Sequence, residues 1–182
     1  MTSSPRRRLI LLRHAKSAWP DVADHERPLA RRGRHDAPAA GRWLRQSGCV
    51  PDSVLCSTAS RARETWQLAQ EKLGARPPAV FERRIYGASS AELLDLARQT
   101  PPDIQSLLIV GHDPAMRELT LELAAPGDGS LAALGRVRIK FPTGAVAVLC
   151  FTGSWPELRP GRARLTEFAV PRTPLNKPML RR

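Results

Sequence analysis

Apolar residues occur in short blocks, separated by stretches in which they recur every three or four positions. Residues 9–12 and 107–110 are entirely apolar, and residues 53–56 and 145–151 are mainly so. Continuous apolar blocks of this length are typical of strands buried on both faces of a sheet. The pattern therefore predicts a sheet that is covered on both sides.

The intervening stretches have the 3.6-residue periodicity of amphipathic helices. We expect helices over residues 31–46, 59–73 and 89–98, and in the stretch that follows Asp113. Gly48 and Gly74 should end the first two, and Pro38 should delay or kink the first. Asp113 should cap the fourth helix, with Pro114 in its first turn.

The remaining segments are shorter. Ser89 and Glu92 have the spacing of a capping box. Further expected features are a brief strand at 80–81, a flexible loop at 126–135, a half-exposed strand at 137–141, a turn at 142–144 and an edge strand at 165–170. Strands that alternate with helices indicate an α/β fold, here a three-layer α/β/α sandwich with a largely parallel sheet.

The chain of 182 residues fits one domain, with a core over about 8–170 and a basic, proline-rich tail over 171–182 that is partly disordered. No apolar stretch is long enough to span a bilayer. Three widely spaced cysteines indicate neither a disulfide framework nor a zinc site, and they favour a cytoplasmic location. We expect a monomer without a membrane partner.

The net charge of +12 comes mainly from arginines scattered over helix faces. No stretch interleaves them with aromatic residues in the manner of a nucleic-acid-binding segment, so we expect no nucleic-acid partner. A basic surface also attracts anionic substrates. We prefer this second interpretation.

The candidate chemistry begins with Arg13 and His14, at the end of the first apolar block. A neutral imidazole can attack phosphorus, and an adjacent guanidinium disfavours its protonation while offering donors to phosphate oxygens. An Arg-His pair is weak evidence alone, because a histidine at a strand end also serves simply to satisfy a carbonyl group.

Two further residues have comparable positions. Arg61 opens a helix, where a cation opposes the helix dipole unless an anion lies nearby. His112 follows the block at 107–110 and is either a donor to a phosphate oxygen or a helix-capping histidine. We expect His25 and His35 to be solvated. No metal-ligand spacing and no glycine-rich nucleotide loop is present, so we expect neither a metal nor a cofactor.

Taken together, these motifs resemble the histidine phosphatase superfamily, which includes the phosphoglycerate mutases. The carrying residues, in order, are Arg13-His14-Ala15 within Leu12–Ser17, then Asp24, Arg27, Pro28, Leu29 and Gly33, then Ser57, Arg61, Ala62 and Thr65, then Tyr86–Ser89 with Glu92, His112, and Phe141–Ala145. The first two motifs are similar to those of the SixA-like phosphohistidine phosphatases. The resemblance implies a phosphoglycerate mutase-like fold and a histidine phosphatase.

By this resemblance, His14 is the nucleophile that becomes phosphorylated, and Arg13, Arg61 and His112 hold the phosphoryl oxygens. Ser17 and Lys16 are candidates for substrate binding. Ala15 stands where the superfamily usually has glycine, although the SixA-like branch often has alanine.

The second departure concerns the general acid of the mutase-like members. Aligning Tyr86-Gly87 puts Arg83 where a glutamate is expected, with Glu82 one residue away, and Glu92 already belongs to the capping box. A missing acid fits phosphohistidine, whose P–N bond breaks readily, better than a phosphate ester.

The expected function is therefore a metal-independent phosphatase that removes phosphate from phosphohistidine on a phosphotransfer protein. Two alternatives stay open. One is a phosphatase of a small phosphorylated metabolite, and the other is a non-enzymatic module that binds phosphate or nucleic acid.

Overall fold

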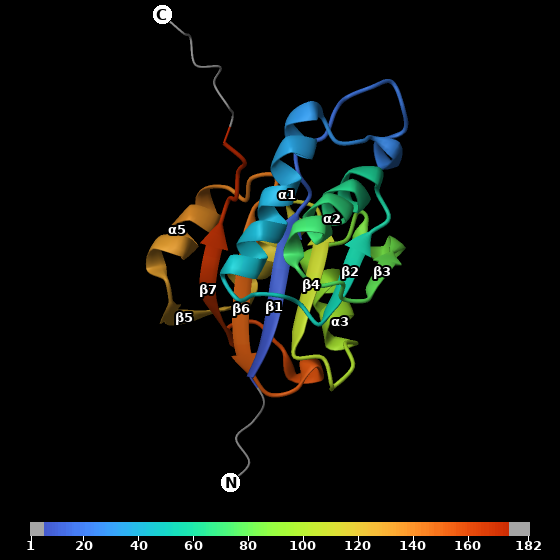
Figure 1. The fold of residues 1–182 in the computed structure, drawn as a ribbon. Helices are drawn as coiled ribbons and strands as arrows, with labels where there is room; N and C mark the ends of the chain where they lie inside the picture. The colour runs from blue at the N-terminus through green and yellow to red at the C-terminus, as the bar shows by residue number, and fades with distance from the viewer. Residues whose placement is uncertain (1–5, 175–182) are drawn as a thin grey trace, which may run out of the picture.

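The computed structural model describes residues 6–174, apart from the side chains of residues 128 and 129. It contains one seven-stranded sheet in the order β3-β2-β4-β1-β6-β7-β5 (Figure 1). The strands are β1 (Arg6–Arg13), β2 (Ser53–Ser57), β3 (Ala79–Glu82), β4 (Ser106–Gly111), β5 (Ala124–Gly129), β6 (Val146–Thr152) and β7 (Ala163–Ala169). The helices are α1 (Arg31–Gln46), α2 (Ser60–Leu73), α3 (Ser90–Arg98), α4 (Ala115–Leu123) and α5 (Leu131–Ile139), with 3-10 turns at Asp24–Glu26, Arg83–Ile85 and Trp155–Glu157.

The sheet is mostly parallel, as predicted. Strands β1 to β4 run in one direction, and β5 is parallel to β7. Strand β6 is antiparallel to both of its neighbours, β1 and β7. The expected edge strand at 165–170 is present as β7, but it lies one place in from the edge because β5 pairs with its outer side.

Alternate side chains of the central strands enter two separate cores. Leu9 and Leu11 of β1 pack among apolar residues of α3, α4 and α5. Ile10 and Leu12 pack among those of α1 and α2 on the opposite face. Burial of both faces explains why these strands are continuously apolar, and it confirms the predicted three-layer α/β/α sandwich (Figure 1).

The predicted helix ends are largely confirmed. Gly48 (φ +67°) follows the last turn of α1, and Gly74 (φ +79°) caps α2 in the left-handed conformation that favours glycine. Ser89 and Glu92 form both hydrogen bonds of the capping box. Helix α1 begins at Arg31 and continues through Pro38, so this proline does not delay its start.

The prediction for residues 126–141 is wrong. The expected flexible loop and half-exposed strand are replaced by β5 and by α5, which Ser130 caps by accepting a hydrogen bond from the Ala133 N–H. Helix α5 shows little helical periodicity because Leu131 and Ile139 are both exposed. The turn at Gly144 (φ +74°) is where it was expected.

The predicted cap of α4 is also wrong. The capping position is Pro114, and the helix makes no side-chain capping bond. The Oδ1 atom of Asp113 is buried without a partner among the described residues. Of the predicted C-terminal tail, residues 175–182 lie outside the described part of the chain. Within that part, no helix is both long and apolar enough to cross a membrane.

One glycine permits the close contact between α1 and α2 that covers a face of the sheet. A Cβ atom on Gly41 would lie 1.8 Å from the backbone carbonyl oxygen of Ala69. Because that oxygen belongs to the backbone, it cannot rotate away, and the two helices would have to separate.

We therefore expect Gly41→Ala to lower the free energy of unfolding by about 1–3 kcal/mol, the usual effect of overpacking. The matched control is Gly135→Ala in α5, where a Cβ atom meets nothing within 4 Å. This control should raise stability by about 0.5–1 kcal/mol, because alanine favours a helix over glycine. Urea unfolding of both variants measures the difference, and equal effects would contradict the packing argument.

Candidate active site

The site lies at the edge of the sheet where β1, β2 and β4 end, at the top of the view in Figure 1. In the parallel pairing of β1 with β4, Arg13 lies opposite Gly111. The first residues beyond the two strands are therefore neighbours. His14 donates its backbone N–H to the Gly111 carbonyl at 3.0 Å, and the His14 and His112 ring centroids are 5.2 Å apart.

His14 is held as a neutral base with a defined tautomer. Its Nδ1 atom is 2.7 Å from the backbone carbonyl oxygen of Ala15. Because a carbonyl oxygen only accepts hydrogen bonds, Nδ1 carries the hydrogen and the lone pair of the neutral ring lies on Nε2. Burial lowers the pKa of His14 to about 3, and the nearby His112, Arg61 and Arg13 act in the same direction.

The backbone after His14 is fixed by α2. The Ala15 N–H donates to the Thr65 hydroxyl at 2.9 Å, and that hydroxyl donates to the Arg61 carbonyl oxygen at 2.6 Å. Ala15 is buried, and no non-glycine residue in the described chain has a positive φ angle. Alanine therefore fits this position without backbone strain.

Arg61 enters the site from the first turn of α2 and is buried. It donates from Nη1 to the backbone carbonyl of Asp24 at 2.6 Å and from Nη2 to the Asp24 carboxylate at 3.1 Å. The anion expected beside this cation is thus the carboxylate of Asp24. Hydrogen bonds from Tyr86, at 2.8 Å, and from Arg27, at 2.7 Å, hold the pKa of Asp24 well below its usual range.

His112 faces His14 from the end of β4. Its Nε2 atom is 2.8 Å from the Ser57 hydroxyl, while its Nδ1 atom is buried without a partner among the described residues. The ring of Tyr86 packs edge-on against it, with centroids 5.7 Å apart. Burial lowers the pKa of His112 to about 4, assisted first by the charge of Arg61.

Arg13 is the second cation of the site. Its Nη1 atom donates to the Phe141 carbonyl at 2.6 Å and lies 3.9 Å from the Asp113 carboxylate. Burial lowers the pKa of Arg13 from its usual value. Its charge acts on both His14 and His112. The structure therefore brings together Arg13, His14, Arg61 and His112, the four residues predicted to form the centre of the site.

The two candidate substrate-binding residues lie differently. Ser17 is buried, and its hydroxyl accepts a hydrogen bond from Arg27 at 2.8 Å. Arg27 in turn binds Asp24, so Ser17 supports the group that holds Arg61. The side chain of Lys16 is exposed, and its backbone carbonyl accepts a hydrogen bond from the Ala30 N–H.

Three residues of the site were not predicted to act there. Asp24 and Tyr86 belong to motifs that carried the family resemblance, and these motifs were the available signal. His25 was expected to be solvated, and this is wrong. Its ring is half-buried, with Nε2 2.9 Å from the Thr58 hydroxyl and an edge-on contact to Tyr86 at 4.8 Å.

The glutamates considered as general acids are held elsewhere. Glu82 accepts hydrogen bonds from the Arg84 backbone N–H and from its guanidinium. Glu92 accepts from the Ser89 N–H in the capping box. These bonds are the leading causes that lower the pKa of both carboxyl groups. In residues 6–174, no group of three or more His, Cys, Asp or Glu residues is placed to hold a metal ion.

Comparison with known proteins agrees with this geometry. Residues 9–86 match the sequence model of the histidine phosphatase superfamily (branch 1). A protein of Mycobacterium tuberculosis is 44% identical over 162 residues, which cover 88% of this chain and all of the relative. A structure from Nakamurella multipartita (printed multipartitia), named as a phosphohistidine phosphatase SixA, is 34% identical with a TM-score of 0.82, over 93% of this chain and 98% of that chain.

A second structure of the same name, from Agrobacterium tumefaciens, is 31% identical with a TM-score of 0.74, over 93% of this chain and all of that chain. The chain belongs to the histidine phosphatase superfamily. Within it, the chain falls in the SixA-like branch and is a phosphatase, a hydrolase. The predicted phosphoglycerate mutase-like fold is confirmed.

The burial of a neutral His14 makes stability depend on pH. An unfolded histidine titrates near pH 6.5, whereas the folded pKa of His14 is about 3. Between these values the unfolded chain binds more protons, so the free energy of unfolding should fall as the pH falls. For His14 we expect a loss of about 2 kcal/mol between pH 6.5 and pH 5.

Denaturant unfolding at several pH values checks this, with His14→Asn as the control whose pH dependence should be shallower. Nitrogen-15 spectra of the imidazole should also show His14 neutral, with hydrogen on Nδ1, at pH 5. A charged His14 at that pH, or parallel stability curves for the two proteins, would refute the assignment.

Proposed function

We propose that this phosphatase removes the phosphoryl group from phosphohistidine displayed on another protein, without a metal and through a phosphorylated His14. The observation that carries the proposal is the pair of neutral histidines in a cluster with two buried cations. Nε2 of His14 bears a lone pair, and Arg13, Arg61 and His112 surround the position of an attacked phosphoryl group.

The first step is an in-line displacement. Nε2 of His14 forms a bond to phosphorus while the P–N bond of the substrate breaks, and the electron pair returns to the departing imidazole nitrogen. That nitrogen takes a proton from solvent. Arg61 exchanges its contact with the Asp24 carboxylate for one with the phosphoryl oxygens, and Arg13 and His112 contribute charge and a donor.

The second step is hydrolysis of the intermediate. Water attacks the phosphorus of phosphorylated His14, the new P–N bond breaks, and the electron pair returns to Nε2. Inorganic phosphate leaves and the neutral base is restored. Neither step needs a carboxylic acid, because imidazole is a good leaving group in both.

The carboxylates favour phosphohistidine over a phosphate ester. Asp24 is ionised and bound to three donors, and Glu82 and Glu92 are held by backbone and side-chain donors. None of the three offers a proton to a departing alkoxide, which an ester requires. The names of the SixA structures from Nakamurella and Agrobacterium support the same substrate class.

The rim of the site also suits a substrate carried by a protein. The Asp24 side chain is 52% exposed although it binds Arg61 directly. Trp19, in the loop before it, is 79% exposed and lies over the guanidinium of Arg27 at 3.2 Å. An exposed aromatic residue beside the nucleophile gives a protein substrate a surface to contact.

The decisive experiment supplies a phosphotransfer protein carrying labelled phosphohistidine, in the presence of a metal chelator. We expect release of phosphate and a transient label on the enzyme that is stable to alkali and labile to acid, as phosphohistidine is. His14→Ala should neither release phosphate nor retain label. Rapid hydrolysis of sugar phosphates with none of phosphohistidine would favour the metabolite alternative instead.

Two arginines on one helix test the role of the clamp. Arg61→Gln should lower kcat/KM by about 10²–10³-fold, the usual cost of one donor to a developing anion. Arg63→Gln is the matched control, because Arg63 is exposed and faces Phe81 instead of the histidines. Initial rates on an aryl phosphate measure both. Similar losses in the two variants would show a general charge effect rather than a specific contact.

A further inference from the structure

A second basic cavity lies at the opposite end of the sheet. It has a volume of about 510 Å³ and is lined by the end of β6, the 3-10 turn Trp155–Glu157, the following loop and the last turn of α3. Thr152 of β6 pairs with Arg6, at the start of β1, whereas His14 follows the end of that strand. At about 3.3 Å per residue, the two sites are roughly 23 Å apart.

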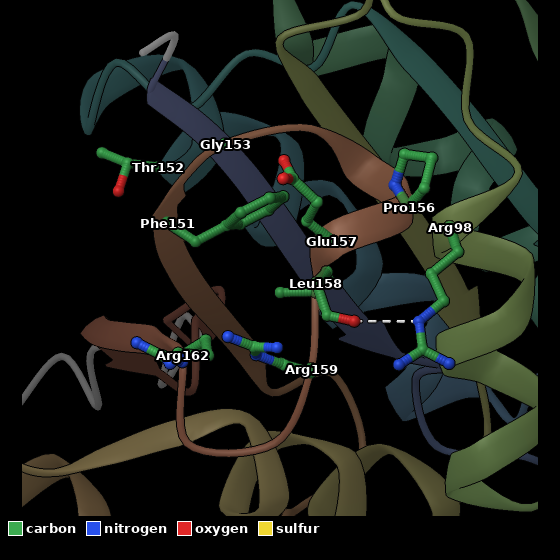
Figure 2. A pocket seen from close by; sticks show the side chains of 9 residues that line it. All are labelled: Arg98, Phe151, Thr152, Gly153, Pro156, Glu157, Leu158, Arg159 and Arg162. Carbon is green, nitrogen blue, oxygen red and sulfur yellow. Dashed lines mark hydrogen bonds between the residues drawn. The ribbon is translucent and has the colours of Figure 1, made fainter. Parts of the chain in front are cut away.

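Three arginines line this cavity (Figure 2). Arg98 projects from α3 on one side, and Arg159 and Arg162 extend from the loop opposite. The backbone N–H of Arg162 donates to the Arg159 carbonyl at 3.2 Å, so a tight turn brings these two residues together. A fourth arginine, Arg7, is buried beside the cavity and donates to the carbonyl oxygen of Gly153, a lining residue.

The positive charge is only partly balanced. Arg98 is paired with Asp95 at 3.0 Å and donates to the Leu158 carbonyl at 2.8 Å. Among the side chains that the structure describes, no carboxylate lies within ion-pair distance of Arg159 or Arg162. Four guanidinium groups therefore face two carboxylates, Asp95 and Glu157.

Glu157 leaves the charge of Arg159 available. Its carboxylate accepts hydrogen bonds from the backbone N–H and the hydroxyl of Ser154, at 2.8 and 2.7 Å. These bonds are the main cause of its lowered pKa, and the charges of Arg159 and Arg7 contribute less. The carboxylate is thus committed to capping the turn.

We propose that this cavity binds a small phosphorylated molecule, with its phosphoryl group held between Arg159 and Arg162. The planar donor array of arginine matches phosphate oxygens. The volume falls in the range of small-molecule sites, and the neighbouring Pro156 and Leu158 give an apolar wall for the rest of the ligand. The enclosure favours a small molecule over an extended nucleic acid, which follows a groove.

The experiment is a titration of the nitrogen-15-labelled full chain with pyrophosphate and, separately, AMP, at constant ionic strength. Backbone amide signals distinguish the two sites, because Gly153 and Leu158 report on this cavity and Gly111 and His112 on the active site. We expect saturable shifts at Gly153 and Leu158. The double variant Arg159→Gln/Arg162→Gln should weaken this binding at least tenfold.

The matched control is Arg76→Gln/Arg138→Gln, which removes the same charge from two exposed positions outside the cavity and should leave the binding unchanged. Turnover of an aryl phosphate should be normal in both double variants, so the outcome is independent of the proposed function. The proposal is overturned by shifts confined to the active site, by equal weakening in the control, or by binding of a single-stranded oligonucleotide alone.

Discussion

The parallel register of β1 and β4 is the constraint on which the site depends. Pairing Arg13 with Gly111 puts the next residue of each strand, His14 and His112, at one edge of the sheet with their rings in contact. The same register sends Leu9 and Leu11 into one core and Ile10 and Leu12 into the other. A slip of one residue would invert these faces, so the stability of the core and the geometry of the histidines are set together.

The second requirement is an uncharged nucleophile among cations. Burial and the neighbouring guanidinium groups both disfavour a proton on His14, and the Ala15 carbonyl fixes the lone pair on Nε2. Such a site stabilises an anion but destabilises itself when empty. Asp24 offsets this cost by binding Arg61 directly. Under the proposed function, the phosphoryl group takes the place of this carboxylate, which therefore keeps Arg61 in position between turnovers.

Much of this arrangement is predictable from local sequence because its causes are local. A continuously apolar strand such as 107–110 needs only burial on both faces, and helix α2 ends at a glycine that adopts the left-handed conformation. Helix α5 was missed because exposed Leu131 and Ile139 remove the periodicity on which prediction relies. The position of Asp24 was unpredictable for another reason, since its partners Arg61 and Tyr86 are 37 and 62 residues away.

The same long-range contacts bear on the choice of substrate. A carboxyl group can protonate a leaving group only if it retains a proton near neutral pH, and this requires burial away from donors. Asp24, Glu82 and Glu92 have the opposite environment, because each accepts hydrogen bonds that favour its ionised form. Residues that appear in sequence as three possible acids are, in the fold, three structural anions. An enzyme with this arrangement depends on the substrate for an easy departure, and a P–N bond to imidazole provides it.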